Sequence, residues 1–180
     1  MFTWIPKGSP IHLRADGNTL PALLRGVAYD WWLGTQNNAA PSHAFPTNFV
    51  RNGDPSGCVD DYSAPFIVGE AAEWLRGRPD PATPFFLTVW MHEPHYPIAS
   101  TERYDARHAA IDDPVERTYR ANVTQLDDAF GRLMKTLDEL GLTKDTLVMF
   151  TSDNGPEGDG STTPARRSDN RRCEPAAALS

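Results

Sequence analysis

The sequence predicts an α/β fold in which two parallel central strands are joined through one long helix and are flanked by helices. Two observations support this prediction. Residues 84–92 and 145–152 are nearly continuous apolar runs, and a long amphipathic stretch lies between them. A strand, a crossover helix and a second strand make a βαβ unit, and the two strands of such a unit are parallel.

The two apolar runs have the composition of strands that are covered on both faces. The run over 84–92 reads Pro-Phe-Phe-Leu-Thr-Val-Trp-Met-His, and the run over 145–152 has Leu-Val-Met-Phe at its centre. Both are rich in the residue types that favour strands. Continuous apolarity, rather than strict alternation, is typical of a central parallel strand, so both runs are expected to be buried.

The stretch between the runs predicts a helix over 114–140. Asp113 is a suitable N-cap, Pro114 suits the first helical position, and Gly141 suits a left-handed C-terminal cap. Apolar residues step by four and three along one face, which predicts a buried stripe. The stripe consists of Tyr119, Val123, Leu126, Phe130, Leu133, Leu137 and Leu140.

A second helix is predicted over 64–75, where apolar residues recur at helical spacing before a glycine and a proline end it. Three regions follow from these elements. Residues 1–63 are mostly irregular, 64–156 form the βαβ core, and 157–180 have no periodicity and no apolar run, which predicts a disordered tail.

Polar side chains follow both predicted strands. His92 and His95 come after the first strand, and Asp153 and Asn154 come after the second. Because ligands bind beyond the carboxyl ends of the strands in open α/β sheets, these side chains are expected to meet at one edge. The histidines suit metal binding, anion binding or acid–base chemistry, but also a purely structural role. Glu93 is expected to be solvated or salt-bridged.

Asp153 and Asn154 offer two hard oxygen ligands, of the kind that Ca²⁺ or Mg²⁺ requires. Two ligands are too few for a closed site, so others would have to come from elsewhere. The alternative is a plain turn that ends a strand, since Asp-Asn-Gly is ordinary turn chemistry.

Composition excludes several classes of protein. The 180 residues carry a formal net charge of -7, which argues against sequence-independent binding to nucleic acid. No stretch reaches the roughly 18 apolar residues of a membrane span. The two cysteines exclude a zinc ribbon and a disulfide scaffold. Residues 1–10 have no apolar core flanked by positive charge, so no signal peptide is expected in this chain.

The two polar clusters, taken with their flanking elements, resemble the sulfatase family of the alkaline-phosphatase superfamily. The stretch 84–97 resembles the family's strand and histidine loop. The stretch 119–156, which ends in Thr-Ser-Asp-Asn-Gly-Pro, resembles its long helix and metal-binding strand. The resemblance covers most of 1–156 and implies a partial alkaline-phosphatase-like sheet.

The resemblance implies metal-assisted hydrolysis of sulfate esters, on an aryl or a glycan substrate. His95 matches the histidine that contacts the sulfate and assists the leaving group, and His92 is carried over as a supporting residue near the substrate. Asp153 and Asn154 match two ligands of a divalent cation, usually Ca²⁺. Family members use a formylglycine made from Cys or Ser, and they are often exported.

Several family motifs do not occur in this chain. The nucleophile motif, Cys or Ser followed by x-Pro-Ser-Arg, is expected before Trp4, and neither Cys58 nor Cys173 has that context. The Lys-x-His pair expected within 24–31 is missing, and no lysine follows Lys144. The chain therefore resembles a truncated and internally deleted sulfatase whose activity is disabled. The alternatives are a non-catalytic remnant or binding module, and a phosphodiesterase or phosphonate hydrolase of the same superfamily.

Overall fold

A computed structural model describes residues 30–35 and 38–152. About half of the first predicted region, the end of the core and the whole tail at 157–180 lie outside these residues. The described elements, in chain order, are β1 (Leu33–Gly34), β2 (Val50–Arg51), β3 (Asp54–Pro55), α2 (Ser63–Arg76), α3 (Glu102–Arg107), α4 (Pro114–Glu139) and the short 3-10 helix η1 (Thr143–Asp145).

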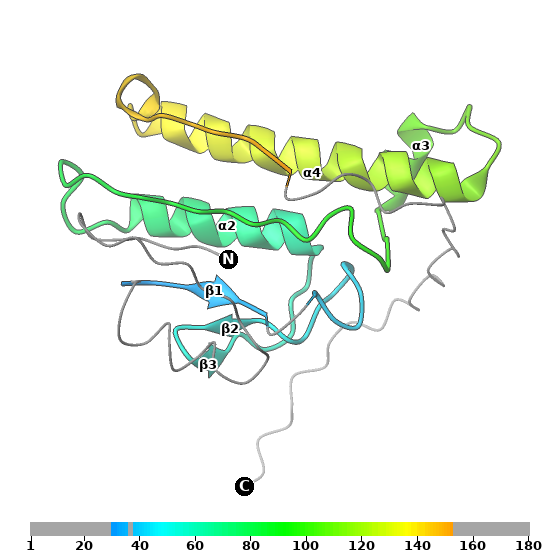
Figure 1. Cartoon of the computed structure of the whole chain (residues 1–180), viewed down its shortest axis with the longest axis horizontal. Helices are drawn as coiled ribbons and strands as arrows, with labels where there is room; N and C mark the ends of the chain where they lie inside the picture. Colours follow the sequence, from blue (N-terminus) through cyan, green and yellow to red (C-terminus); the bar gives the residue numbers. More distant parts are fainter. Residues whose placement is uncertain (1–29, 36–37, 153–180) are drawn as a thin grey trace, which may run out of the picture.

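The strands form one small antiparallel sheet in the order β1-β2-β3. Helix α2 lies between this sheet and α4, and α3 packs beside the start of α4 (Figure 1). Residue Phe49, just before β2, meets Phe66 of α2 with ring centroids 5.1 Å apart. The fold is therefore mixed α/β, with a core that runs from the sheet through α2 to α4. In the described part of the chain, no helix is both long and apolar enough to cross a membrane.

Helix α2 confirms the predicted helix over 64–75. Its apolar residues recur every three or four positions, so they line one side of the helix. Its buried residues are Ser63, Ala64, Ile67, Val68, Ala71, Ala72 and Leu75. Small side chains at several of these positions let neighbouring elements approach closely, and α4 packs against α2 along this length.

The end of α4 confirms the predicted cap at Gly141. This glycine has a φ of 70°, which a residue without Cβ adopts at little cost. Its N–H donates to the carbonyl of Asp138 at 2.9 Å, and the N–H of Leu142 donates to the carbonyl of Leu137 at 2.8 Å. This pair of hydrogen bonds is the Schellman motif, so the chain turns away immediately after the helix.

The buried face of α4 is not the stripe that the spacing predicted. Leu133 and Leu137 are buried as expected, but Leu126 and Phe130 are only half-buried and Val123 is 38% exposed. Small and polar residues occupy most of the buried face, which comprises Ala121, Asn122, Gln125, Ala129, Leu133, Thr136 and Leu137. The apolar stripe faces partly outward because no sheet among residues 30–35 and 38–152 covers it. Phe130 instead meets Phe150, with ring centroids 5.1 Å apart.

The predicted parallel strands are not shown by the structure. Residues 84–92 and 146–152 are extended chain without strand pairing, and the described strands are antiparallel. The second stretch is also exposed rather than buried: Leu147 is 85% and Met149 is 81% exposed. Strand pairing requires a neighbouring strand to satisfy the backbone groups, and neither stretch pairs with one among the described residues.

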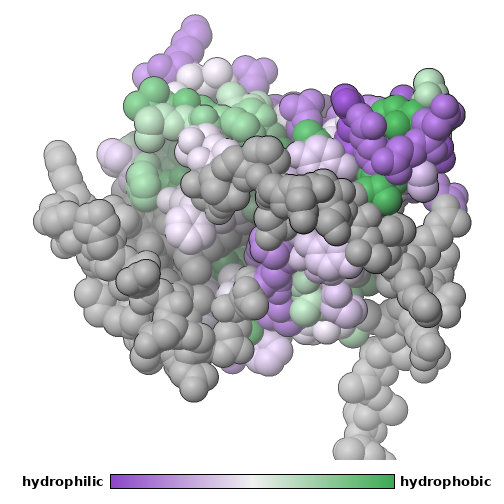
Figure 2. All heavy atoms as spheres, turned by 45° about the vertical axis from the view of Figure 1, so that its right-hand side comes forward, coloured by the Kyte–Doolittle hydropathy of each residue, from purple (hydrophilic) through white to green (hydrophobic). Residues whose placement is uncertain are grey.

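Hydrophobic side chains consequently reach the surface, and Figure 2 shows them gathered along the upper part of one face. The large exposed apolar side chains are Phe86, Trp90, Tyr96, Val123, Leu140, Leu147, Val148, Met149 and Phe150. Six of them belong to the two stretches predicted as central strands.

The first turn of α4 offers a test of helix capping. The Asp113 side chain accepts a hydrogen bond from the N–H of Val115 at 2.9 Å. We expect Asp113→Ala to lower the free energy of unfolding by about 1 kcal/mol, because one donor at the helix start loses its partner. Urea denaturation measures the loss. Asp112→Ala is the matched control, since Asp112 is exposed and uses its backbone carbonyl to accept from Arg117. Equal losses in the two variants would contradict the capping role.

Candidate functional site

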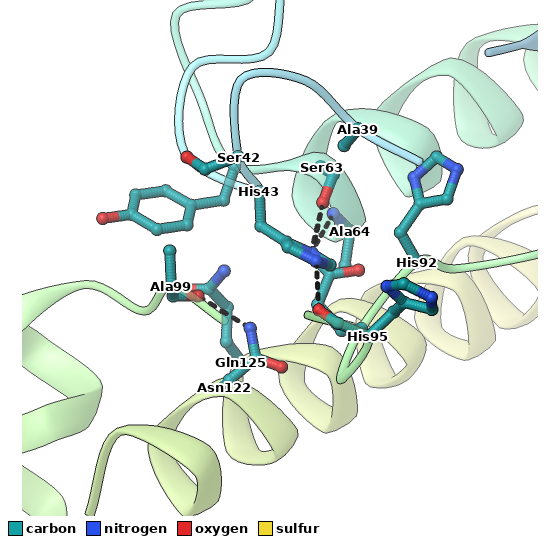
Figure 3. Close-up of polar contacts among 12 residues, drawn as sticks. Ala39, Ser42, His43, Ser63, Ala64, His92, His95, Ala99, Asn122 and Gln125 are labelled. Carbon is teal, nitrogen blue, oxygen red and sulfur yellow. Dashed lines mark hydrogen bonds and ion pairs between the residues drawn. The ribbon is translucent and has the colours of Figure 1, made fainter. Parts of the chain in front are cut away.

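The candidate site is the loop over 92–96, which follows the extended segment and turns sharply. The N–H of His95 donates to the carbonyl of His92 at 2.9 Å, which closes the turn. The loop lies against the start of α2 and against residues 38–43 (Figure 3). Segments that are far apart in sequence therefore meet around two of the predicted site residues.

A buried polar network lies directly beneath this loop. Glu93 and His43 are both fully buried, with Nδ1 of His43 3.4 Å from Oε1 of Glu93. The Ser63 hydroxyl donates to the same carboxylate oxygen at 2.6 Å, and the N–H of Ala64 donates to it at 2.9 Å. Glu93 was expected to be solvated or salt-bridged, and the structure shows a buried ion-pair geometry.

The surroundings of Glu93 favour its ionised form. Burial alone would raise the pKa of this carboxyl, but His43, Ser63 and the N–H of Ala64 outweigh burial and hold the pKa below its usual value. Ala64 lies in the first turn of α2, where the helix dipole also favours a negative charge. The Glu93 carboxylate thus accepts a hydrogen bond from the start of α2, although it lies 29 residues further along the chain than Ala64.

Ser63, His43 and Glu93 do not form a nucleophilic triad. In such a triad the hydroxyl and the carboxylate bind opposite nitrogens of the imidazole. Here Ser63 and Glu93 both approach Nδ1 of His43, at 3.2 and 3.4 Å. The other nitrogen, Nε2, contacts the carbonyl of His95 at 2.7 Å, and the Ser63 side chain is fully buried. The group is therefore a structural network that contacts the loop.

His92 points inward from the loop. Its Nε2 lies 3.2 Å from the Thr35 hydroxyl, and its ring packs against Phe49 with a centroid distance of 5.6 Å. Burial lowers the pKa of His92 to about 4, so the imidazole is neutral at pH 7. A neutral and largely enclosed ring suits a supporting role better than attraction of an anion.

His95 points outward from the same loop and is exposed. Its Nδ1 lies 2.6 Å from the Tyr96 carbonyl and 2.9 Å from Nδ2 of Asn38. The Asn38 amide is itself oriented, since its Oδ1 accepts from the N–H of Ala39 and its Nδ2 donates to the Tyr96 carbonyl. Nε2 of His95 has no hydrogen bond to the residues that the structure describes, so this nitrogen is presented to solvent.

The predicted metal ligands, Asp153 and Asn154, lie outside the described residues. Within 30–35 and 38–152, no group of three or more His, Cys, Asp or Glu side chains is arranged to hold a metal ion. The described residues therefore do not fit a complete cation site. The expected meeting of His95 and Asp153 stays a prediction.

Comparison with known proteins decides the family. The model of the sulfatase family matches residues 9–175. The chain belongs to the sulfatase family. This places it in the alkaline-phosphatase superfamily and agrees with the resemblance of the histidine loop and of the stretch over 119–156.

Similar proteins include longer sulfatases. An endo-4-O-sulfatase of Bacteroides thetaiotaomicron is 28% identical over 163 residues, covering 78% of this chain and 31% of that protein. Human arylsulfatase A is 39% identical over 74 residues, covering 41% of this chain and 13% of that protein. Among solved structures, Ps i-CgsB matches with a TM-score of 0.49 and 22% identity, covering 52% of this chain and 21% of that one. The sulfatase chain described here thus spans less than a third of the length of these proteins.

Sequence reasoning located the histidine loop but missed the residues that hold it. His43, Ser63 and Asn38 stand in irregular or helix-start positions that carry no motif. One signal was available in the sequence: Glu93 lies between two histidines and next to a proline. A carboxylate in so short a loop is more constrained than an ordinary surface glutamate. The donors that it would meet were not deducible, because they lie 29 and 30 residues away.

Proposed function

We propose that this chain is part of a sulfuric-ester hydrolase and that His95 is its catalytic histidine. The observation that supports the proposal is the geometry of the His95 ring. Nδ1 is held within the loop by the Tyr96 carbonyl, which also accepts from Nδ2 of Asn38, whereas Nε2 faces solvent. One nitrogen thus orients the ring and the other is free to meet a substrate.

The chemistry of a sulfate ester suits a group of this kind. When the S–O bond of the ester breaks, negative charge develops on the leaving oxygen, and a proton donor offsets that charge. With both ring nitrogens protonated, Nδ1–H of His95 donates to the Tyr96 carbonyl and Nε2–H is directed outward. His95 then supplies its proton from Nε2, while the neutral ring of His92 fixes the base of the loop through Thr35.

A divalent cation, with Ca²⁺ as the first candidate, is assigned by the family resemblance to Asp153 and Asn154. When bound, such an ion polarises sulfate oxygens as a Lewis acid. The formylglycine of the family has no precursor motif within these 180 residues. The substrate class is a sulfate ester of a glycan or an aryl alcohol, in keeping with the names of the two relatives described above.

The two unpaired extended stretches fit the same proposal. In a complete sulfatase domain, residues 84–92 and 145–152 would be the parallel central strands of a larger sheet, with α4 as their crossover. Their exposed apolar side chains support this, because contiguous apolar surface of this kind marks a contact region. The chain also spans only 31% of the endo-4-O-sulfatase that it matches, which leaves room for the remaining strands.

The isolated chain is expected to show no turnover of an aryl sulfate above background in the presence of Ca²⁺. The nucleophile motif and the lysines that would neutralise sulfate charge are missing from it, and catalytic groups that act as a unit do not leave proportional activity. The assay compares the purified chain with His95→Ala. Turnover that disappears in His95→Ala would overturn the disabled state while supporting the role of His95. Turnover that is equal in both would indicate a contaminant.

The role of His95 is tested separately through anion binding. Inorganic sulfate is titrated into the isotopically labelled chain while the ring signals of the histidines are followed by NMR. We expect the signals of His95 to shift. The signals of His108, which directly follows α3, should stay unchanged. If His95 does not respond to sulfate, the proposed contact with substrate is wrong.

A further inference from the structure

We propose that the buried pair His43–Glu93 is a positioning device for His95; this inference rests on the proposed role of His95. The pair joins two sides of the loop to two different parts of the fold. Glu93 ties the loop to the first turn of α2, and His43 ties the backbone of His95 to the segment before β2. His43 and Glu93 are positioning residues because neither presents a group to solvent.

The two ties lie on either side of Pro94. On one side, Oε1 of Glu93 accepts from the N–H of Ala64 at 2.9 Å and from the Ser63 hydroxyl at 2.6 Å. On the other side, the His95 carbonyl accepts from Nε2 of His43 at 2.7 Å. A loop that is fixed at both of these points cannot rotate the His95 backbone without breaking a buried hydrogen bond, and buried groups have no water to replace the lost partner.

Counting the protons shows which form of His43 makes every contact. The His95 carbonyl is an acceptor, so Nε2 of His43 carries a proton. The one proton of the Ser63 hydroxyl is used on Glu93 at 2.6 Å. Nδ1 of His43 therefore needs its own proton to bond with Ser63 and Glu93, at 3.2 and 3.4 Å. The doubly protonated ring opposite an ionised carboxylate satisfies all these atoms, and it makes the bond to His95 charge-assisted.

The ring of His95 is held by the same segment that holds its backbone. Nδ1 of His95 donates to the Tyr96 carbonyl at 2.6 Å, and Nδ2 of Asn38, only a few residues before His43, donates to the same carbonyl at 2.9 Å. The segment is itself fixed, since Asn48 donates from Nδ2 to the Asn38 carbonyl at 2.8 Å. Residues 38–43 therefore set both the position of the His95 backbone and the direction of its imidazole. A network that only added stability would not need both contacts to converge on the one exposed histidine of this loop.

The test compares three variants of the full chain. His43→Leu removes the donor to the His95 carbonyl, whereas His43→Gln keeps an amide N–H at similar reach. His108→Leu is the control, because His108 contacts the Thr124 hydroxyl at 2.8 Å in a different part of the molecule. The readouts are the ring-nitrogen NMR shifts of His95 and the hydrogen exchange of its N–H, which is bonded to the His92 carbonyl.

In His43→Leu, we expect the NMR shifts of the His95 ring nitrogens to become those of a free histidine. We expect the backbone N–H of His95 to exchange about tenfold faster, because the loss of one hydrogen bond weakens the loop by about 1 kcal/mol. His43→Gln should restore both toward wild type. The proposal is overturned if His43→Leu resembles His108→Leu, or if His43→Gln fails to restore the His95 signals. Should His43→Leu not fold, His43→Asn takes its place, because its shorter amide lies near the Nδ1 position and does not reach the His95 carbonyl. Unchanged His95 shifts in that variant overturn the proposal equally.

Titration of wild type and His43→Leu with inorganic sulfate distinguishes failure of this inference from failure of the proposed function. If the wild-type His95 signals ignore inorganic sulfate but still depend on His43, the positioning inference stands and the proposed contact with substrate fails. If sulfate shifts the His95 signals equally in wild type and in His43→Leu, the contact with substrate stands and the positioning inference fails.

Discussion

Replacing Glu93 by alanine is expected to lower the free energy of unfolding by about 3 to 5 kcal/mol, the loss that follows when one partner of a buried ion pair is removed. The variant leaves Nδ1 of His43 without its carboxylate partner in a fully buried site. It also leaves the N–H of Ala64 and the Ser63 hydroxyl without the acceptor that they share. Urea denaturation of wild type and variant at pH 7 measures the loss.

The loss should depend on pH in a defined direction. Because the folded-state pKa of Glu93 is held below its usual value, its ionised form stabilises the fold above the unfolded-state pKa of about 4.3. This stabilisation disappears as the pH falls through the folded-state pKa, so the wild-type and variant stabilities should approach each other in acid. Glu116→Ala, which removes an exposed pair with Arg120, is the control and should cost no more than about 0.5 kcal/mol. A Glu93→Ala loss as small as the control's would contradict the buried pair.

Leu133→Ala is expected to cost about 2 to 5 kcal/mol, the range for truncating a large buried side chain in a core. Leu133 is 7% exposed and lies where α4 packs on α2, within the cluster that includes Ile67 and Leu75. Both helices are long and regular, so neither can readily close the space that the missing carbons leave. Chemical denaturation followed by circular dichroism reports the change.

Val123 provides the comparison on the same helix. It is 38% exposed, although the spacing placed it on the same stripe as Leu133. Val123→Ala should therefore change the stability by no more than about 0.5 kcal/mol. If the two truncations cost the same, the packing of α4 described above is wrong, and the stripe that the spacing predicted would be the better account of the core.

The helices were predictable because their signals are local. Asp113, Pro114 and Gly141 mark the ends of α4 within a few residues of each end, and the structure has all three in the predicted roles. The orientation of the helix was harder to predict. Spacing reports where apolar residues gather, but the face that becomes buried depends on what packs there. Helix α2 packs on the side of α4 that carries Ala129, Leu133 and Leu137.

The strands and the network beneath the loop were less predictable, for a shared reason. An apolar run predicts that a segment is buried, but whether it forms a strand depends on other strands that pair with it. Among the described residues, no strand pairs with 84–92 or 146–152. Similarly, the sequence indicated that His95 stands in a functional loop, but not that His43 contacts its carbonyl from 52 residues away. Long-range polar contacts leave no periodic trace in a sequence. The roles of His92, Asp153 and Asn154 stay predictions.

The tie between α2 and Glu93 also bears on how the chain is made. Ala64 receives its acceptor from a residue 29 positions later. At a synthesis rate of about 5 to 20 residues per second, the first turn of α2 waits about 1.5 to 6 seconds for that acceptor to be added. During this interval only water can accept from the N–H of Ala64, which has no partner within the helix. Because of the order of translation, the start of α2 gains its last hydrogen-bond acceptor only when the histidine loop has been synthesised.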